Sequence, residues 1–292
     1  TIPYIEQVFG AWHIGGGLGS LATALEKRCT ERGVDIRVGV TVTKIDTQGG
    51  SVSGVRLDTG EFIAADIVVS NSDAALTRDL LSQPDQKLMP KITDSPSLAG
   101  FVLLLALDGT TEGIAHHNVW FPENYNAEFD AIFARSPTPP NDPAIYACVP
   151  DDPQMRPSPD CESWFILVNA PRHDSSGANG FNWNASGCKE QYAQQILDIL
   201  AARGTDIRHR VKWQEIRTPA DLERDAMAPG GSIYGTSSNG PRAAFTRPAN
   251  QSNIPGLYLV GGSSHPGGGL PLVGMGAEIT AELIGRAEKP NP

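Results

Sequence analysis

The sequence predicts an α/β domain that is interleaved along the chain with an α+β domain. A short apolar strand, Leu257 to Val260, leads into a glycine-dense loop and then a helix. Residues 66–70 form an apolar run that ends in small polar residues, which is typical of a buried parallel strand whose carboxyl end meets a ligand. Between these two segments, strands are separated by long irregular connections, which favours a mixed or antiparallel sheet covered by helices.

The first 70 residues predict one helix followed by short strands. Residues 18–32 carry apolar side chains at helical spacing and precede Gly33, a residue type that often ends helices. Apolar residues at positions 38, 40, 42 and 45 indicate a first strand. Further strands are expected at residues 52–57, 61–64 and 66–70.

The central part of the chain predicts the second sheet. Residues 98–107, 163–170 and 210–216 are expected to be strands, and residues 189–203 have the apolar face of an amphipathic helix. The longest apolar run, Phe101 to Leu107, is about a third of the ~20 residues that a membrane helix needs. No transmembrane anchor is therefore expected, and attachment to a membrane surface is left open.

Composition limits the class of protein. The 292 residues predict about two domains, and the net charge of −10 argues against nucleic acid as a partner. The four cysteines are scattered, with no CxxC pair and no zinc spacing, so no metal site is expected. Free thiols of this kind are typical of a reducing compartment, which predicts a cytoplasmic protein.

A cluster of glycines precedes the first expected helix. The segment Gly15-Gly16-Gly17-Leu18-Gly19-Ser20 approaches a dinucleotide-binding fingerprint, but Ser20 stands where a third glycine belongs. No acidic residue ends the strand expected to follow, between residues 40 and 43. A tight turn that packs a helix on a sheet is therefore favoured over a phosphate-binding loop.

Several segments together form an ordered series that matches a known family. They are Phe9–Trp12, Gly15–Gly17, Leu21–Leu25, Gly33–Ile36, Val42–Ile45, Gly54–Val55, Gly60, Ala65–Asp73, Gly230–Gly235, Arg247–Asn250 and Leu257–Pro271. This series resembles the bacterial-type phytoene (carotenoid) desaturases, which are flavoproteins related to the amine oxidases. The loop from residue 261 to residue 271 is the most specific part of the match.

The resemblance implies an FAD-dependent oxidoreductase. The fold would be the remnant of an α/β cofactor domain, of the FAD/NAD(P)-binding type, interleaved with an α+β substrate domain. Residues 1–30 would enter the substrate domain and residues 31–90 would belong to the FAD domain. Residues 91–250 would form the substrate domain, and residues 251–292 would return to the FAD domain.

The resemblance also implies cofactor contacts, while no catalytic residue is assigned. Val42 would lie on the strand beside the adenine, and Gly261 and Gly262 would lie where the ribityl chain passes. The isoalloxazine would be approached by Gly269, Leu270, Pro271 and Leu272. A helix that starts there could stabilise a reduced, anionic flavin by about 0.3–1 kcal/mol. His265 is the ionisable group of the loop, and bordering the flavin or capping the turn are equally compatible with its position.

In the family, the first strand and its GxGxxG loop hold the pyrophosphate of FAD. The present sequence contains no GxGxxG segment. The chain by itself is therefore expected to bind FAD weakly or not at all.

The implied reaction is desaturation of a carotenoid-like, apolar polyene by hydride transfer to the flavin. Such chemistry needs positioning and a dry apolar channel, so the lack of a catalytic triad is consistent with it. Two alternatives are kept: a flavoprotein like the retinoid saturases or carotenoid ketolases, and a cofactor-free binding module. The Gly230–Gly235 and Arg247–Asn250 segments favour the desaturase branch, and the retained glycine loop argues against the cofactor-free module.

Overall fold

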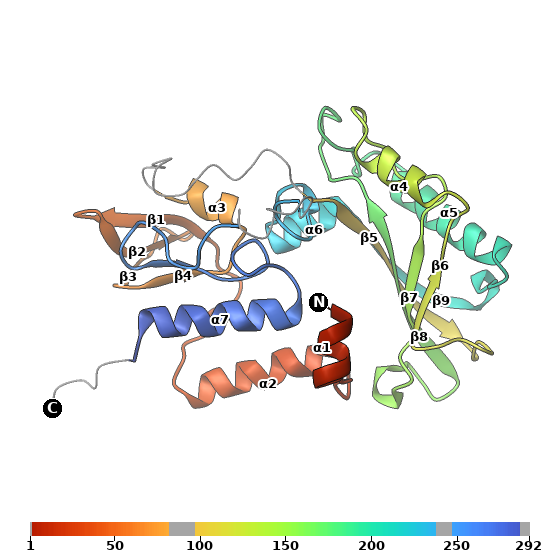
Figure 1. Cartoon of the computed structure of the whole chain (residues 1–292), viewed down its shortest axis with the longest axis horizontal. Helices are drawn as coiled ribbons and strands as arrows, with labels where there is room; N and C mark the ends of the chain where they lie inside the picture. Colours follow the sequence, from red (N-terminus) through yellow and green to blue (C-terminus); the bar gives the residue numbers. More distant parts are fainter. Residues whose placement is uncertain (1, 82–96, 238–246, 287–292) are drawn as a thin grey trace.

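The computed structural model describes residues 2–81, 97–237 and 247–286, arranged as two sheet-containing lobes (Figure 1). In the first lobe, an antiparallel sheet contains three strands, β1 (Val42–Gln48), β2 (Ser51–Leu57) and β3 (Phe62–Ala64). Two further strands, β4 (Val68–Ser70) and β10 (Leu257–Leu259), run parallel to each other. Val68 pairs with Leu257 and Ser70 with Leu259, so two segments that are distant in sequence lie side by side.

The two sheets of the first lobe share one small core. Ile45 of β1, Val52 of β2 and Leu257 and Leu259 of β10 are each at most 7% exposed and pack in one cluster. The Val52 N–H also donates to the carbonyl of Pro255. Burial of these apolar side chains therefore unites segments from both ends of the chain. Helices α3 (Ala74–Asp79) and α7 (Leu270–Ile284) complete the lobe.

The second lobe is built on an antiparallel sheet with the strand order β6-β7-β8-β5-β9. Its strands are β5 (Ala99–Asp108), β6 (His117–Trp120), β7 (Ile145–Cys148), β8 (Cys161–Ala170) and β9 (Val211–Arg217). The long β5–β8 ladder pairs ten residues on each strand without a register shift. The expectation of a helix-covered antiparallel sheet between the two parallel strands is confirmed.

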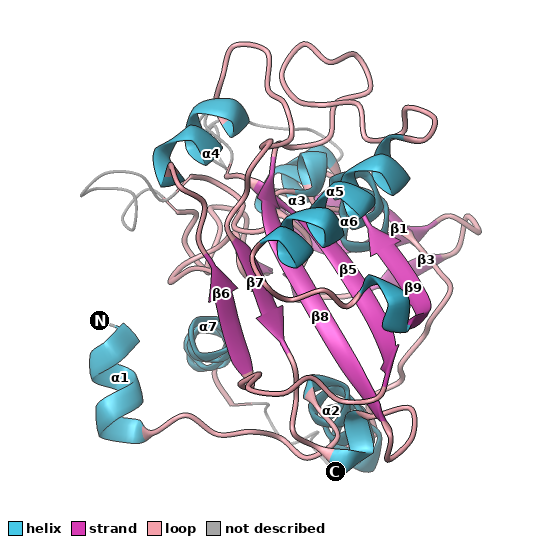
Figure 2. Cartoon of the chain, turned by 90° about the vertical axis from the view of Figure 1, so that its right-hand side faces the viewer, coloured by secondary structure: helices cyan, strands magenta, loops and turns pink. Residues whose placement is uncertain are grey.

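One face of the large sheet is covered by α5 (Cys188–Ala202), with α4 (Tyr125–Ile132) on the same side (Figure 2). Helix α5 buries Tyr192, Ile196 and Leu200, which recur at helical spacing as the sequence predicted. Phe101 of β5 lies edge-on to Tyr192, with ring centroids 5.0 Å apart. Helices α4 and α5 therefore leave the opposite face of the sheet uncovered.

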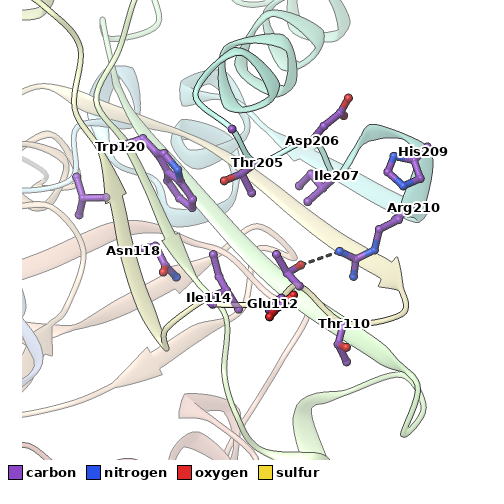
Figure 3. A pocket seen from close by; sticks show the side chains of 14 residues that line it. Thr110, Glu112, Ile114, Asn118, Trp120, Thr205, Asp206, Ile207, His209 and Arg210 are labelled. Atoms are coloured by element: carbon purple, nitrogen blue, oxygen red, sulfur yellow. Dashed lines mark hydrogen bonds between the residues drawn. The ribbon is translucent and has the colours of Figure 1, made fainter.

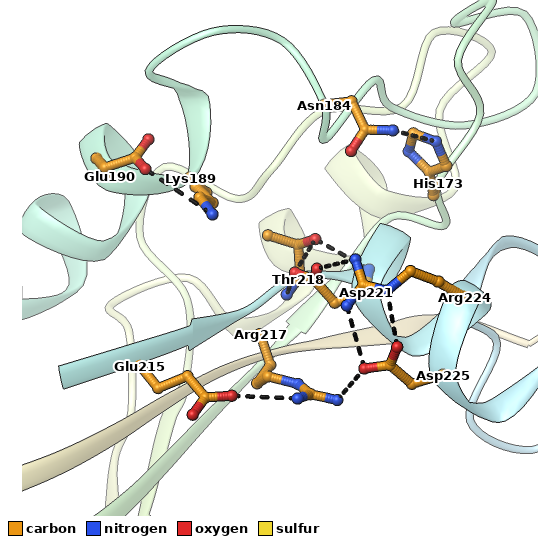
Figure 4. Close-up of polar contacts among 10 residues, drawn as sticks. All are labelled: His173, Asn184, Lys189, Glu190, Glu215, Arg217, Thr218, Asp221, Arg224 and Asp225. Carbon is orange, nitrogen blue, oxygen red and sulfur yellow. Dashed lines mark hydrogen bonds and ion pairs between the residues drawn. The ribbon is translucent and has the colours of Figure 1, made fainter. Parts of the chain in front are cut away.

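Helix α6 (Pro219–Ala226) follows β9 and is held by polar contacts (Figure 4). Thr218 and Asp221 form a capping box, in which the Thr218 hydroxyl accepts from the Asp221 N–H and the Asp221 carboxylate accepts from the Thr218 N–H. The next turn, η3 (Pro229–Gly231), lies so close that a Cβ at Gly231 would be 2.1 Å from the Pro219 carbonyl oxygen. The two backbone segments can approach this closely only because glycine has no Cβ.

The segment after η3 connects the large sheet to the first lobe. Ser232 forms a bridge with Ala99 at the start of β5, and its hydroxyl lies 2.6 Å from that of Ser97. The Ser97 N–H donates to the carbonyl of Gly235. Tyr234 and Gly235 are thereby held beside the glycine loop that follows β10.

Three expectations for the first lobe need correction. The first strand, expected to carry the apolar residues at positions 38, 40, 42 and 45, begins only at Val42 as β1. Residues 38 and 40 lie before it without strand pairing, and Val38 is 85% exposed. Strand β4 is parallel but is not buried on both faces, since Val69 is 45% exposed. Helix α2 (Leu18–Glu31) forms as predicted, yet it has no buried residue, and Leu18 and Leu25 are more than half exposed.

The early glycine segment is a turn, but its partner is a loop and not a sheet. The Gly16 N–H donates to the Asp152 carboxylate at 2.8 Å, and Gly17 lies against Met155. Asp152 also starts the short helix η1 (Pro153–Met155). The helix before this turn is α1 (Ile2–Phe9).

Among the described helices, none is long and apolar enough to cross a membrane. The predicted domain border at residues 90 and 91 lies outside the described residues, as do the residues after 286. The four-part domain division stays a prediction.

Candidate functional site

The candidate site lies where the parallel strands β4 and β10 end. The Val260 N–H donates to the Ser70 carbonyl at 2.9 Å, so both strands deliver their carboxyl ends to the same edge. The loop after β4 begins α3, and the loop after β10 contains residues 261–269 and begins α7. Carboxyl ends of parallel strands are the usual ligand position in α/β folds.

The two loops are joined by hydrogen bonds. The Ser263 hydroxyl accepts from the Ala74 N–H at 3.0 Å, and Asp73 caps α3 by accepting from the Ala75 N–H at 2.8 Å. Burial raises the pKa of Asp73, and the bond from Ala75 opposes part of that rise. A Cβ at Gly261 would lie 2.5 Å from the Asn71 side-chain oxygen, so the loops touch through glycine backbone.

Arg247 braces the glycine loop against the segment that comes from the large sheet. Its Nη1 donates to the carbonyl oxygens of Tyr234, at 3.0 Å, and Gly262, at 2.7 Å. Burial lowers the pKa of the Arg247 guanidinium. The Tyr234 ring in turn packs close to Gly268, where an added Cβ would be 3.1 Å from Cδ1.

Asn250 organises the other side of the loop. Its side chain is 3% exposed, and its Nδ2 donates to the carbonyl oxygens of Leu259, at 3.0 Å, and His265, at 2.8 Å. The His265 N–H donates to Pro248 at 2.9 Å, and the His265–Pro266 peptide is cis. Both residues of the Arg247–Asn250 segment that carry polar side chains therefore hold the loop in shape.

The start of α7 is open. Gly269 is the N-cap residue with φ 107°, and no atom lies within 4 Å of the position that a Cβ would take. Leu270 and Pro271 are exposed and Leu272 is half-buried. The first N–H groups of a helix have no acceptor within the helix, and no side chain caps them here. They can bind an electron-rich group that lies on the loop.

The structure brings most of the predicted site residues together, with one exception. Gly261, Gly262, Gly269 and the start of α7 belong to one continuous loop and helix. Val42 instead begins β1 of the three-stranded sheet and is 36% exposed. His265 is exposed on the loop, and its backbone makes the described contacts.

Sequence reasoning did not assign functions to three residues that shape the site, Arg247, Asn250 and Tyr234. The signal was present, because all three lie in segments that match the desaturase series. Their role depends on contacts between loops that are distant in sequence, which a pattern along the chain does not reveal.

A second candidate surface is the open face of the large sheet, opposite α5. Leu104 and Phe165 are register partners on β5 and β8, and Phe165 is 39% exposed. Together with Met155 and Trp213 they line an apolar pocket of about 480 Å³. Figures 1 and 2 place α7 beyond this face and α5 on the other. The apolar pocket and the glycine loop thus lie on the same side of the large sheet.

A polar pocket of about 540 Å³ lies between the loop after β5, strand β6 and the short helix η2 (Arg208–Arg210) (Figure 3). Arg210 donates to the Thr111 hydroxyl at 2.7 Å, and its guanidinium also pairs with Glu162 at 3.1 Å. Thr111, Glu162 and Arg210 thus bond to one another, and none of them belongs to the glycine loop. We therefore assign these side chains a structural role.

Curated relatives match nearly the whole chain. A 4,4'-diapolycopene oxygenase of a Methylomonas species is 33% identical over 291 residues, which is 97% of this chain and 56% of the relative. A 4,4'-diaponeurosporene oxygenase of Staphylococcus aureus (strain USA300) is 32% identical over 296 residues, or 99% of this chain and 58% of the relative. The chain therefore spans just over half the length of these relatives.

A solved structure supports the fold. An oxidoreductase from Methanosarcina mazei is 20% identical, with a TM-score of 0.59 over 92% of this chain and 55% of that protein. The family model described as flavin containing amine oxidoreductase matches residues 4–273, which includes both parallel strands, the large sheet and the glycine loop. The chain belongs to the flavin containing amine oxidoreductase family.

Proposed function

We propose that this chain forms the flavin-facing loop and the substrate-facing sheet of an FAD-dependent oxidoreductase that acts on a carotenoid-like polyene. The single observation that carries the proposal is the open start of α7 beside the braced glycine loop, on the same side as the apolar face of the large sheet. The names of the relatives supply the substrate class.

The residues at the loop fit a flavin. The position that a Cβ at Gly269 would take is empty to 4 Å, so a flat ring could approach the backbone there. Gly261 and Gly262 would border the ribityl chain, and Leu270, Pro271 and Leu272 would border the ring. The uncapped N–H groups of the helix would favour electron density on the ring edge. Val42 would contribute only at the adenine end.

When bound, FAD would supply a two-electron acceptor for a hydride removed from the polyene. The residues of this chain would act by positioning and by excluding water, and no acid–base residue is assigned. Asn250 and Arg247 would keep the loop rigid through their bonds to Leu259 and Gly262. A rigid loop fixes the distance between the acceptor and the substrate, on which the rate of hydride transfer depends.

The apolar sheet face would hold the substrate. Leu104, Phe165 and Trp213 offer hydrocarbon and aromatic surface without a charged group among them. A linear polyene has no polar group to form hydrogen bonds. Its binding free energy would therefore come from burial of apolar area, at roughly 25 cal/mol per Å². The exposed side chains of Tyr4, Phe9 and Trp12 would suit peripheral contact with the membrane from which such a substrate comes.

A second reaction on the same substrate class is oxygenation of the polyene. The observation that favours it is that both curated relatives named above are oxygenases. It corresponds to the ketolase-like alternative from the sequence. The two reactions would use the same flavin and the same apolar pocket. They differ in whether the polyene loses two hydrogen atoms to the flavin or gains an oxygen atom from dioxygen.

One experiment separates these reactions. The purified chain would be supplied with FAD and a linear carotenoid in detergent micelles, and the products analysed by mass spectrometry. Loss of two hydrogen atoms supports desaturation, and gain of oxygen supports oxygenation. If the polyene binds with the same affinity with and without FAD, and no product forms, the chain would instead be a cofactor-free binding module. Failure to bind the polyene contradicts the proposal, whereas weak binding of FAD agrees with the absence of a GxGxxG segment from this sequence.

A further inference from the structure

Two histidines and one cysteine meet where β6 begins and β7 ends. The ligand atoms of His116, His117 and Cys148 all lie within 4.8 Å of one another. None of these residues belongs to the glycine loop, and the scattered cysteines gave no metal spacing in the sequence. Imidazole nitrogen and thiolate sulfur are the ligands that zinc prefers.

The backbone holds the three residues in place. His117 and Cys148 are direct register partners on β6 and β7, so their side chains leave neighbouring strands together. The His116 carbonyl accepts from the Val149 N–H at 2.8 Å, which ties the residue before β6 to the residue after β7. The cluster is therefore part of a sheet edge and does not depend on a long loop.

The separations require only side-chain adjustment. Zinc bonds of about 2.0–2.3 Å in a tetrahedral site place the ligand atoms roughly 3.3–3.7 Å apart. The rings of His116 and His117 have centroids 4.5 Å apart and an interplanar angle of 62°. Rotation about χ angles can bring the donors from within 4.8 Å to within coordination distance without moving a strand.

Neighbouring groups are arranged as they are around metal ligands. The Tyr146 hydroxyl lies 2.8 Å from Nδ1 of His117, a contact that fixes the orientation of that imidazole. The His13 ring lies 5.3 Å from that of His116, and its Nε2 is already paired with Asp152 at 3.0 Å. His13 thus contacts the ring of His116 while its own Nε2 is held by Asp152.

We propose that His116, His117 and Cys148 form a binding site for a zinc-class divalent cation. The soft thiolate and the two imidazoles exclude Mg²⁺ and Ca²⁺, which take oxygen ligands. On binding, the Zn–S bond forms as the Cys148 thiol releases its proton to solvent. Cys148 also lines the apolar pocket, so a bound ion would lie at the edge of that pocket.

The test uses the whole chain, stripped of metal with a chelator under reducing conditions. Zn²⁺ would be titrated against a chromophoric competitor, and Co²⁺ would be added as a spectroscopic probe. One equivalent of Zn²⁺ is expected to bind, and Co²⁺ is expected to give a thiolate charge-transfer band in the near ultraviolet. His117→Gln and Cys148→Ser should each weaken Zn²⁺ binding by at least about 100-fold, and Tyr146→Phe by about 10-fold.

Matched controls distinguish the site from other thiols and from loss of fold. Cys29→Ser, at an exposed cysteine on α2, should leave the affinity and the Co²⁺ band unchanged. Circular dichroism should show that Cys148→Ser remains folded. The proposal is overturned if no equivalent of Zn²⁺ binds to the folded wild-type chain, or if Cys148→Ser keeps the charge-transfer band.

Discussion

The hydroxyl of Ser263 accepts a 3.0 Å hydrogen bond from the backbone N–H of Ala74, across 189 residues of sequence. Ser263 lies in the loop after β10, and Ala74 is the first residue of α3 after β4. The bond satisfies one of the N–H groups that a helix start leaves without an acceptor in the helix. It therefore joins the two loops that form the edge of the candidate flavin site.

Ser263→Ala is expected to destabilise the chain by about 0.5–2 kcal/mol, as loss of a helix cap does. The measurement is urea denaturation followed by circular dichroism. Ser20→Ala, at an exposed position on α2, serves as the control and should change stability by less than about 0.5 kcal/mol. Equal effects of the two substitutions would show that the bond between the loops has no energetic role.

The chain by itself is expected to bind FAD with a Kd of about 1 µM or weaker, since the sequence has no GxGxxG segment for the pyrophosphate. Quenching of flavin fluorescence during titration measures this affinity. Submicromolar binding, or yellow protein straight from the cell, would refute the expectation and would mean that other residues hold the phosphates.

Gly269→Val is expected to weaken FAD binding further, because the added side chain would fill the open space at the start of α7. Gly285→Val is a matched control at the other end of the same helix. Gly285 also has a positive φ, of 83°, and open space around it, so the backbone strain is comparable. If both variants bind FAD equally well, the ring does not lie at Gly269.

Gly231→Ala is expected to destabilise the fold by more than the ~1 kcal/mol typical of strain at a positive φ. The new Cβ would lie 2.1 Å from the Pro219 carbonyl oxygen, which is backbone and must shift. Gly204→Ala, at φ 92° with no atom within 4 Å, carries the strain without the collision. Thermal melts of the pair compare the two effects, and a larger loss at Gly204 would contradict this account.

Glu162→Gln is expected to lower stability at neutral pH by about 1.5–3 kcal/mol, the range for hydrogen bonds to a charged group. Glu162 is 6% exposed and accepts from Thr111, Trp164 and Arg210. Burial raises the pKa of Glu162, but these bonds outweigh burial and leave the pKa below its ordinary value. Denaturant melts give the difference, with Glu190→Gln, in an exposed pair with Lys189, as the control.

The pH dependence of the Glu162 effect has a definite sign. Because the folded-state pKa is lowered, the stabilisation is complete above the ordinary carboxyl pKa of about 4.3 and is lost as pH falls toward the folded-state value. The stabilities of the wild type and Glu162→Gln should therefore converge in acid. A gap that widens below pH ~4 would contradict the assigned cause.

Local patterns in the sequence were sufficient for the elements that carry their own signal. The spacing of Tyr192, Ile196 and Leu200 predicted α5, and the apolar run before Ser70 predicted a parallel strand. The glycine density after Val260 predicted an open loop at a helix start. Such features depend on side-chain periodicity and backbone freedom within a few residues, so one sequence records them.

Other features were decided only by contacts between distant segments. The alternation around Val38 resembles a strand, but a strand also needs a partner for its hydrogen bonds, and none of the described strands supplies one. Arg247 reaches Gly262 only because the chain returns from the large sheet beside the loop. His117 and Cys148 meet because of the β6–β7 register, which is set by the packing of the whole sheet and by no local period.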